Sequence, residues 1–296
     1  SVPLVQVPNS AQALGLAASR FFDQPSSHLR VVGITGTNGK TTVAYILESI
    51  LQAAGRVVGV VGTVNHRCGA QVWPSTNTTP ESLDLQKLLA EMRSAGATHV
   101  VMEVASHGLA LNRVDGCEFD VGVFTNLTQD HLDFHGDMSR YWETKKRLFT
   151  ELLPASAKNV QAVINQDNDH GRELAAQVAT ALPTLTFGFD GTNHIRPSVQ
   201  ASDLSGIRGR IHSPAGVTAA LACRRSIRAS RVAAASGSVT TSHRGRKAWA
   251  CSSNRPTLRC PQRRWTAKRP STGETDAWLT KMQERAAYSS GGSLFS

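Results

Sequence analysis

The stretch that decides the fold is Val31-Val32-Gly33-Ile34-Thr35-Gly36-Thr37-Asn38-Gly39-Lys40-Thr41-Thr42, in which a short apolar strand runs into a glycine-rich turn and then into a helix. This order is typical of a phosphate-binding loop, because glycines let backbone N–H groups point at phosphate oxygens and the helix adds its positive N-terminal end. Lys40 offers a positive charge and Thr41 a hydroxyl for Mg²⁺. Ile34 stands where the usual GxxxxGK[ST] motif has its first glycine, so the loop is a variant. A merely structural turn is the alternative, and the Lys-Thr-Thr run argues against it.

Around this loop, residues 28–190 alternate short apolar runs with longer amphipathic ones. The pattern is typical of βα units, and it predicts an α/β fold with a mainly parallel sheet flanked by helices. The predicted strands are Arg30–Thr35, Val57–Val61, His99–Val104, Asp120–Thr125, Gln161–Asn165 and Thr184–Phe189. The predicted helices are Thr41–Ala54, Thr79–Gly96, Ser139–Leu153 and Asp167–Leu182, with Thr79 as an N-cap and Pro80 at the first helical position.

Length and composition fit an enzyme. The chain has 296 residues, which is enough to bury a sizeable core. Its five cysteines form no CxxC pair, so neither a disulfide framework nor a zinc ribbon is indicated, and a reducing cytoplasm is the default. The sequence begins Ser1-Val2-Pro3 without a signal-peptide pattern, and no apolar run is long enough to suggest a membrane span. We expect a soluble, cytoplasmic protein whose sequence is incomplete at its start.

The net charge of +10 belongs to one end of the chain. Residues 1–216 hold 17 Lys and Arg against 19 Asp and Glu, whereas residues 217–296 hold 15 against 3. The second segment is also rich in Ser, Ala, Arg and Thr and keeps neither the helical nor the strand period, so we assign it no packed core. The charge of the whole chain is therefore no evidence that the α/β region binds nucleic acid.

Three further segments carry candidate functional side chains. Glu103 ends a predicted strand, and the carboxyl edge of a parallel sheet faces the ligand crevice. His131 and His135 follow the next predicted strand, in the segment Thr125-Asn126-Leu127-Thr128-Gln129-Asp130-His131-Leu132-Asp133-Phe134-His135. Lys145 lies in the predicted helix Tyr141-Trp142-Glu143-Thr144-Lys145-Lys146-Arg147-Leu148-Phe149. Taken singly, a solvated glutamate, surface histidines and a basic helix face are the simpler readings.

Taken together, these motifs resemble the Mur ligases and the related folylpolyglutamate synthetases. The resemblance implies that ATP is bound by the loop Gly36, Thr37, Asn38, Gly39, Lys40, Thr41 and Thr42. It also implies that Lys40, Glu103, His131 and Lys145 are catalytic, that Thr41 and Glu103 hold one Mg²⁺, and that His131 and Lys145 hold a second. In the family the lysine at this position is carbamylated by carbon dioxide, which turns a cation into an anion that can ligate Mg²⁺. Lys146 is the alternative lysine, and His135 is expected to be structural.

One segment narrows the resemblance within the family. Asn77-Thr78-Thr79-Pro80 looks like the pocket for UDP-N-acetylmuramoyl-L-alanyl-D-glutamate in the Mur ligase that adds the third peptide residue, and Arg113 fits the same pocket as an anion-binding side chain. Ala105 stands in this pocket where a substrate-binding serine is usual, and Leu111 stands where some members have glutamine. The implied partners are this nucleotide peptide, ATP and a diamino acid, either meso-diaminopimelate or L-lysine.

The resemblance covers roughly residues 1–215. Residues 1–29 look like the end of the family's N-terminal UDP-binding domain, and residues 30–216 look like its central ATP-binding domain. An Asn-rich adenine-contact segment and a C-terminal domain with an Asp-Asn-Pro-Arg-type motif are expected from the family but absent from the sequence. The tail at 217–296 is either a basic nucleic-acid-binding arm or sequence out of frame with the rest, and we favour the second. Retranslation of the DNA in the other frames would decide.

The resemblance thus implies ATP-dependent amide ligation, with a carboxylate activated as an acyl phosphate and then attacked by an amine. Three alternatives stay open at this point: a folylpolyglutamate synthetase-like ligase, a P-loop NTPase switch, and a nucleotide-binding protein without catalysis. A folate substrate would identify the first, and phosphate release independent of any acceptor amine would identify the second. We expect no ligation by residues 1–296 alone, because the acceptor-binding domain is missing.

Overall fold

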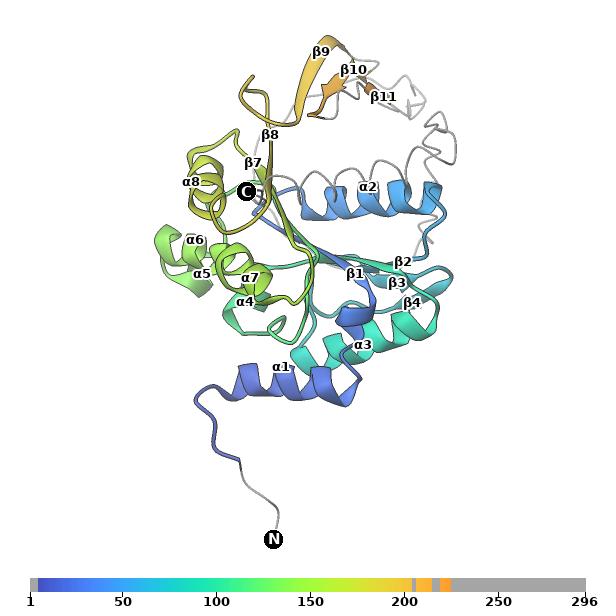
Figure 1. Ribbon diagram of the computed structural model, residues 1–296, viewed down its shortest axis with the longest axis vertical. Helices are drawn as coiled ribbons and strands as arrows, with labels where there is room; N and C mark the ends of the chain where they lie inside the picture. The colour runs from blue at the N-terminus through green and yellow to red at the C-terminus, as the bar shows by residue number, and fades with distance from the viewer. Residues whose placement is uncertain (1–4, 204–205, 215–218, 225–296) are drawn as a thin grey trace, which may run out of the picture.

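A computed structural model describes residues 5–203, 206–214 and 219–224. Its centre is an eight-stranded sheet in the order β4-β3-β2-β5-β1-β6-β7-β8 (Figure 1). Six strands run parallel, namely β1 (Arg30–Thr35), β2 (Val58–Val61), β5 (His99–Glu103), β6 (Val121–Phe124), β7 (Gln161–Asn165) and β8 (Thr184–Phe187). The prediction of an α/β fold with a mainly parallel sheet is confirmed.

The first strand of the sheet is also its central strand. β1 pairs with β5 on one side, where Ile34 lies opposite Glu103, and with β6 on the other, where Thr35 lies opposite Phe124. The loop after β1 is therefore flanked by the residues that follow β5 and β6. Parallel strands end at the same edge of a sheet, so this register gathers three candidate segments around one turn.

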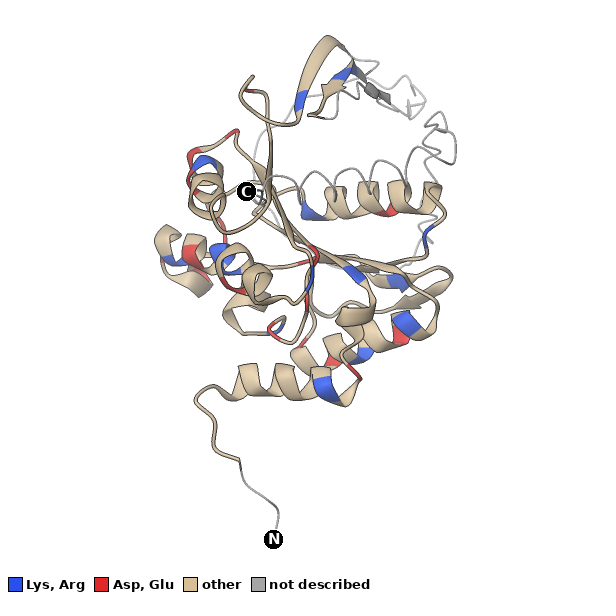
Figure 2. Cartoon of the chain, in the orientation of Figure 1, with Lys and Arg blue, Asp and Glu red and all other residues tan. Residues whose placement is uncertain are grey.

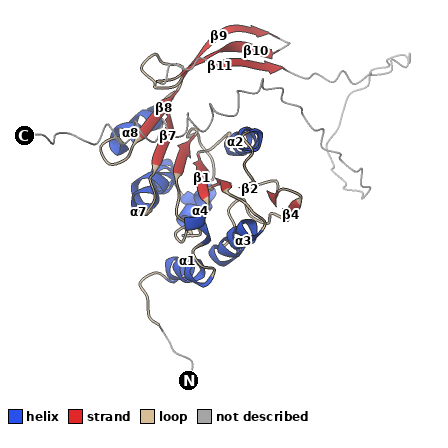
Figure 3. Ribbon diagram, turned by 45° about the vertical axis from the view of Figure 1, so that its right-hand side comes forward, coloured by secondary structure: helices blue, strands red, loops and turns tan. Residues whose placement is uncertain are grey.

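Helices cover both faces of the sheet (Figures 1 and 3). α2 (Lys40–Ala53) lies on one face, and α1 (Ser10–Phe21) and α3 (Ser82–Ser94) lie on the other. The remaining helical elements are a 3₁₀ turn at Pro25–His28, α4 (Ser106–Ala110), α5 (Leu132–His135), α6 (Met138–Arg147), a π turn at Leu148–Leu152, α7 (Leu153–Ala155) and α8 (Asp169–Val178). Lys, Arg, Asp and Glu are interspersed over these elements (Figure 2).

Two hydrophobic cores follow from the alternation of side chains along the strands. Val100 and Met102 of β5 belong to the larger core, which includes Leu85 and Leu89 of α3. Val101 points the other way, into the core that includes Ala44 of α2. Because both faces of a parallel sheet are buried, each central strand reads as a continuous apolar run.

Two smaller units were not predicted from the sequence. β3 (His66–Cys68) and β4 (Gln71–Trp73) form an antiparallel hairpin beside β2 at the sheet edge. β9 (Arg196–Asp203), β10 (Gly206–His212) and β11 (Ala219–Arg224) form a separate antiparallel sheet. The predicted low-order tail lies outside the described residues except for Ala219–Arg224, which are in β11.

The predicted helix N-cap at Thr79 was wrong. α3 begins at Ser82 with Glu81 as its N-cap residue, and Thr79 lies in the preceding loop. Thr79 fails to cap because its hydroxyl donates to Glu103 O at 2.9 Å and accepts from Ala105 N at 3.0 Å. None of the helices in the described ranges is both long enough and apolar enough to cross a membrane.

Candidate active site

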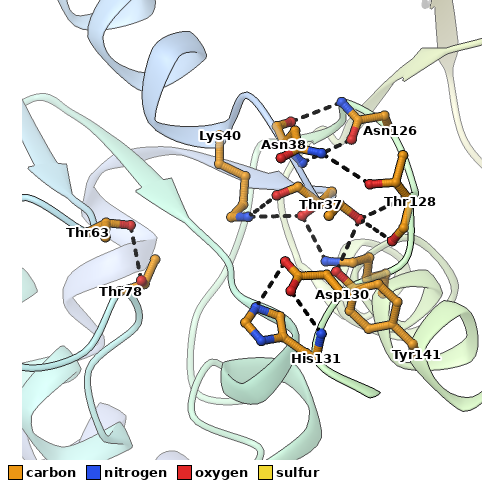
Figure 4. A network of polar contacts seen from close by, with 12 residues as sticks. Thr37, Asn38, Lys40, Thr63, Thr78, Asn126, Thr128, Asp130, His131 and Tyr141 are labelled. Atoms are coloured by element: carbon orange, nitrogen blue, oxygen red, sulfur yellow. Dashed lines mark hydrogen bonds and ion pairs between the residues drawn. The ribbon is translucent and has the colours of Figure 1, made fainter. Parts of the chain in front are cut away.

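The turn between β1 and α2 is held from the side by the residues that follow β6 (Figure 4). Thr37 N donates to Asn126 O at 2.8 Å, and Asn38 N donates to Asn126 Oδ1 at 2.9 Å. Thr125 Oγ1 donates to Asn38 O at 2.7 Å. Gly36 has φ +138°, and a Cβ on it would overlap Thr125 Oγ1, so the close approach of the two segments requires glycine here. The turn is thus fixed without any ligand.

Lys40 folds back over this turn. Its Nζ donates to Gly36 O at 3.0 Å and to Thr37 O at 2.9 Å. Burial lowers the pKa of Lys40, whereas Glu103 and then Asp130 act in the opposite direction. Lys40 is the first residue of α2, so its ammonium lies close to the positive N-terminal end of this helix. The two together are suited to bind an anion such as phosphate.

Lys145 reaches the same turn from α6. Its residue is 1 % exposed, and its Nζ donates to Gly36 O at 2.8 Å. The nitrogen also lies 4.5 Å from the centroid of the Tyr141 ring. Burial first, and the Lys40 ammonium second, lower the pKa of Lys145 to about 7, while Asp130 opposes the shift. Two lysines therefore share one carbonyl, and at neutral pH a large fraction of Lys145 is an uncharged amine.

Glu103 meets the turn from β5. The residue is 2 % exposed, and its Oε2 accepts from Thr41 Oγ1 at 2.7 Å. Its carboxylate also accepts from Thr63, which follows β2: Thr63 N donates to Oε1 at 3.0 Å and Thr63 Oγ1 donates to Oε2 at 3.2 Å. A buried carboxylate beside a hydroxyl offers the hard oxygen donors that Mg²⁺ prefers.

His131 lies next to Asp130, in the segment that follows β6 (Figure 4). Its side chain is 47 % exposed, its Nε2 is 3.5 Å from Asp130 Oδ2, and its ring packs edge-on against His107 with centroids 4.9 Å apart. Throughout the ranges that the structure describes, no three His, Cys, Asp or Glu side chains lie close enough together to hold a metal ion. Glu103, His131 and Lys145 thus surround the turn without forming a ready-made ligand cluster.

The predicted substrate segment lies beside Glu103. Thr79 is 1 % exposed and its hydroxyl is engaged by backbone groups, so it anchors the segment, whereas Asn77 is exposed and Thr78 half-buried. Arg113 donates to Thr79 O at 3.1 Å, and its guanidinium pairs with Glu81 at 2.5 Å. Ala105 contributes only its backbone N–H to this network.

Sequence reasoning did not assign roles to several residues of the site. Asn126 and Thr128 clamp the turn, Tyr141 places its hydroxyl 3.1 Å from Thr37 Oγ1, and Thr63 holds Glu103. Asn126 and Tyr141 lie in segments whose motifs were recognised, which was a usable signal. Thr63 follows a strand whose end carries no charged residue, so nothing in its sequence context indicated a functional position. Thr42 is exposed in the first turn of α2.

Comparison with known proteins identifies the family of the chain. Residues 34–224 match the Mur ligase middle domain family. A UDP-N-acetylmuramoyl-L-alanyl-D-glutamate–2,6-diaminopimelate ligase from Geobacter metallireducens is 45 % identical over 214 residues, which are 72 % of this chain and 42 % of that protein. The ligase of the same name from Solibacter usitatus is 46 % identical over 204 residues, 69 % of this chain and 40 % of the relative. The chain spans less than half the length of these relatives.

Solved structures give the same result. The structure of a UDP-N-acetylmuramoyl-L-alanyl-D-glutamate–2,6-diaminopimelate ligase is similar with a TM-score of 0.64 at 29 % identity, over 74 % of this chain and 44 % of the other. A MurF ligase from Thermotoga maritima in complex with ADP is similar with a TM-score of 0.53 at 25 % identity, over 74 % and 46 %. With a family match that covers most of the chain and relatives above 40 % identity, the protein belongs to the Mur ligase family.

Proposed function

We propose that this chain is the nucleotide-binding part of an ATP-dependent amide ligase, which adds a diamino acid to UDP-N-acetylmuramoyl-L-alanyl-D-glutamate in peptidoglycan synthesis. The observation that carries the proposal is the gathering of Lys40, Lys145, Glu103 and Thr41 at one glycine turn. Such a turn offers backbone N–H groups, a cation and metal-binding oxygens to a triphosphate. The reaction would serve cell-wall biogenesis, and hence cell shape and division, in the cytoplasm.

The residues present fit a magnesium ion. Thr41 Oγ1 and Glu103 Oε2 lie 2.7 Å apart and would hold the first ion together with phosphate oxygens. The neutral amine of Lys145 can attack carbon dioxide: a C–N bond forms, one C–O π pair moves to oxygen, and the nitrogen loses a proton. The resulting carbamate on Lys145, with His131, would hold a second ion. Bound Mg²⁺ would neutralise negative charge on the phosphates during transfer.

The chain's own groups would then position the reaction. The first backbone N–H groups of α2 and the Lys40 ammonium would hold the β- and γ-phosphates, since the N–H groups of Thr37 and Asn38 already donate to Asn126. A D-glutamyl carboxylate oxygen attacks the γ-phosphorus, the bond to ADP breaks, and an acyl phosphate forms. The amine of the diamino acid then attacks the acyl carbon, phosphate leaves, and the nitrogen loses a proton. Catalysis in this scheme is mainly positioning and charge neutralisation.

The substrate assignment follows the names of the relatives, which are diaminopimelate ligases. Asn77 is exposed and Thr78 is half-buried, and the hydroxyl of the next residue, Thr79, links this segment to the backbone of Glu103 and Ala105. Arg113 would bind the substrate carboxylate once Glu81 moves away from it. Meso-diaminopimelate is the favoured acceptor on these grounds, and L-lysine is the alternative.

The domain assignments stay part of this proposal. Residues 1–29 would be the end of a UDP-binding domain and 30–216 the central ATP-binding domain. The family match continues to residue 224, so a tail outside the family would begin after that residue rather than at 217. Because the chain spans less than half of its relatives, a nucleotide-binding fragment without catalysis is the second candidate. The described sheet also resembles that of Escherichia coli FolC in complex with ADP, with a TM-score of 0.51 at 22 % identity, which is a likeness of fold alone.

The first half-reaction tests the proposal. The chain is incubated with MgATP and UDP-N-acetylmuramoyl-L-alanyl-D-glutamate without any diamino acid, and ADP and acyl phosphate are quantified, the latter by trapping with hydroxylamine. Binding of the same nucleotide peptide and of a folate is compared by calorimetry. Binding of the muramoyl peptide, or acyl phosphate formation that requires it, supports the ligase. ADP formation indifferent to the peptide supports an NTPase, and nucleotide binding alone supports the second candidate.

A further inference from the structure

In the part of the chain that the structure describes, the Glu103 carboxylate accepts two hydrogen bonds from Thr63 and one from Thr41. The backbone N–H of Thr63 reaches one carboxylate oxygen at 3.0 Å, and its hydroxyl reaches the other at 3.2 Å. Thr41 supplies the remaining contact, at 2.7 Å. A carboxylate with two oxygens and three donors around it has little freedom to rotate, so two of the three bonds that fix its orientation come from Thr63.

The residue before Thr63 lets this contact form. A Cβ on Gly62, the residue after β2, would overlap Glu103 Oε1, so any larger residue here would displace the carboxylate from its present position. The Gly62-Thr63 pair therefore forms one wall of the Glu103 site. Both residues directly follow β2, a strand that contributes no residue to the turn between β1 and α2.

The hydrogen bonds of Thr63 have a fixed direction. An ionised carboxylate only accepts, so the single hydroxyl proton of Thr63 is donated to Glu103. The Thr63 hydroxyl also lies 3.0 Å from Thr78 Oγ1 (Figure 4), and in this contact Thr63 must accept and Thr78 must donate. The result is a series of two hydrogen bonds, in which Thr78 donates to Thr63 and Thr63 donates to Glu103.

Each end of this series of hydrogen bonds lies at a proposed binding site, Thr78 at that of the peptide and Glu103 at that of Mg²⁺. Thr78 lies in the segment that is proposed to bind the muramoyl peptide, and its neighbour Thr79 is bonded to the backbone oxygen of Glu103. If a substrate group accepts the hydrogen bond of the Thr78 hydroxyl, Thr78 no longer donates to Thr63. The Thr63 hydroxyl would then lose an acceptor interaction that strengthens its own donation to Glu103.

We infer that Thr63 is a positioning residue, which fixes the Glu103 carboxylate for Mg²⁺ and links it to Thr78 in the peptide-binding segment. The inference deepens the proposed function and rests on it. The hydrogen bonds of Thr63 go to Glu103 and Thr78, whereas those of Lys40 and Lys145 go to the backbone of the turn. The effect of Thr63 therefore falls on the metal dependence of nucleotide binding rather than on nucleotide binding itself.

The test measures ADP binding by calorimetry over a series of Mg²⁺ concentrations. Thr63→Val keeps the shape but loses the hydroxyl, and we expect the Mg²⁺ concentration of half-maximal effect to rise roughly ten-fold, the size expected for one hydrogen bond to a charged group. Thr63→Ser restores the hydroxyl and should stay within about two-fold of the parent. Thr78→Val removes only the hydrogen bond from Thr78 to Thr63, and it should raise the Mg²⁺ concentration of half-maximal effect by less than Thr63→Val does. ADP binding without Mg²⁺ should be the same in all four proteins.

Thr180→Val, at an exposed position in the turn after α8, controls for the loss of a threonine hydroxyl. Thermal unfolding of each variant shows whether it is folded. Parent-like Mg²⁺ dependence in Thr63→Val, or an equal loss of binding with and without Mg²⁺, would overturn the inference and leave the proposed function intact. Failure of the parent to bind ADP at any Mg²⁺ concentration would overturn both.

Discussion

The surroundings of Lys145 change the chemistry of its amine. Its Nζ is buried and shares the Gly36 carbonyl with Lys40, and together these conditions lower its pKa to about 7. An ordinary surface lysine stays charged at this pH and is a poor nucleophile toward carbon dioxide. The pattern Tyr141-x-x-x-Lys145 resembled the family motif, but only the fold brings the helix against the turn. Burial of this kind cannot be read from a helix that looks basic and solvated.

The lowered pKa of Lys145 makes the stability of the protein depend on pH in a predictable direction. Between pH 7 and about 10.5 the unfolded chain protonates this lysine and the folded chain does not, so the free energy of unfolding rises with pH in this window. The contribution is at most about 1.4 kcal/mol per pH unit. In bicarbonate-free buffer, Lys145→Met should lose this rise, and below pH 7 it should be the more stable protein. Urea unfolding at several pH values measures both, with Lys87→Met as the control on an exposed lysine. Equal pH slopes in parent and Lys145→Met would contradict the assigned burial.

At the scale of elements, the phosphate-loop motif was the most informative part of the sequence. It predicted β1 and the start of α2 to within one residue, and the βα alternation located β2, β5, β6, β7 and β8. The hairpin β3–β4 was missed because its strands have three residues each, too few to show a period. The start of α3 was misplaced because Thr79 has two backbone partners outside the helix, which the local Thr-Pro signal cannot reveal.

The contact between the turn and β6 depends on Gly36. In Gly36→Ala the new methyl group would meet Thr125 Oγ1 at a backbone φ of +138°, so the clash and the strain both act. We expect a loss of stability of about 3 kcal/mol or more, with nucleotide binding abolished. Gly55→Ala is the matched control, since Gly55 has φ +76° but open space around its Cβ position, and it should cost only about 1 kcal/mol. Similar losses in the two variants, measured by chemical denaturation, would show that the turn is not clamped as described.

At the scale of the whole molecule, the two edges of the sheet have separate tasks. The carboxyl edge holds the turn and the side chains that contact it, and the amino edge holds a charge network around the buried Asp120. Asp120 accepts from Arg30 and from the backbone N–H of Val31, and Lys158 Nζ lies 2.7 Å from its Oδ2. Sequence alone located Asp120 at a strand start but gave no sign of Lys158, which is 38 residues away.

This separation predicts a variant that affects stability alone. Asp120→Asn removes the charge of a buried carboxylate that pairs with the half-buried Lys158, and breaking such a pair costs about 3 kcal/mol. Asp169→Asn, at an exposed pair on α8, should cost less than about 1 kcal/mol. Unfolding by urea gives both values. At a temperature where both variants are folded, each should bind nucleotide as the parent does. Weakened nucleotide binding in folded Asp120→Asn would mean that the two edges are coupled.

We propose that Lys40 is the residue through which the turn between β1 and α2 holds a magnesium-bound triphosphate. Calorimetric titration of MgATP into the parent, Lys40→Ala and Lys87→Ala tests it most directly, because Lys87 is an exposed lysine on α3. We expect the parent and Lys87→Ala to bind with equal affinity and Lys40→Ala to bind at least about ten-fold more weakly. Equal binding by Lys40→Ala, or no binding by the parent, would contradict the account.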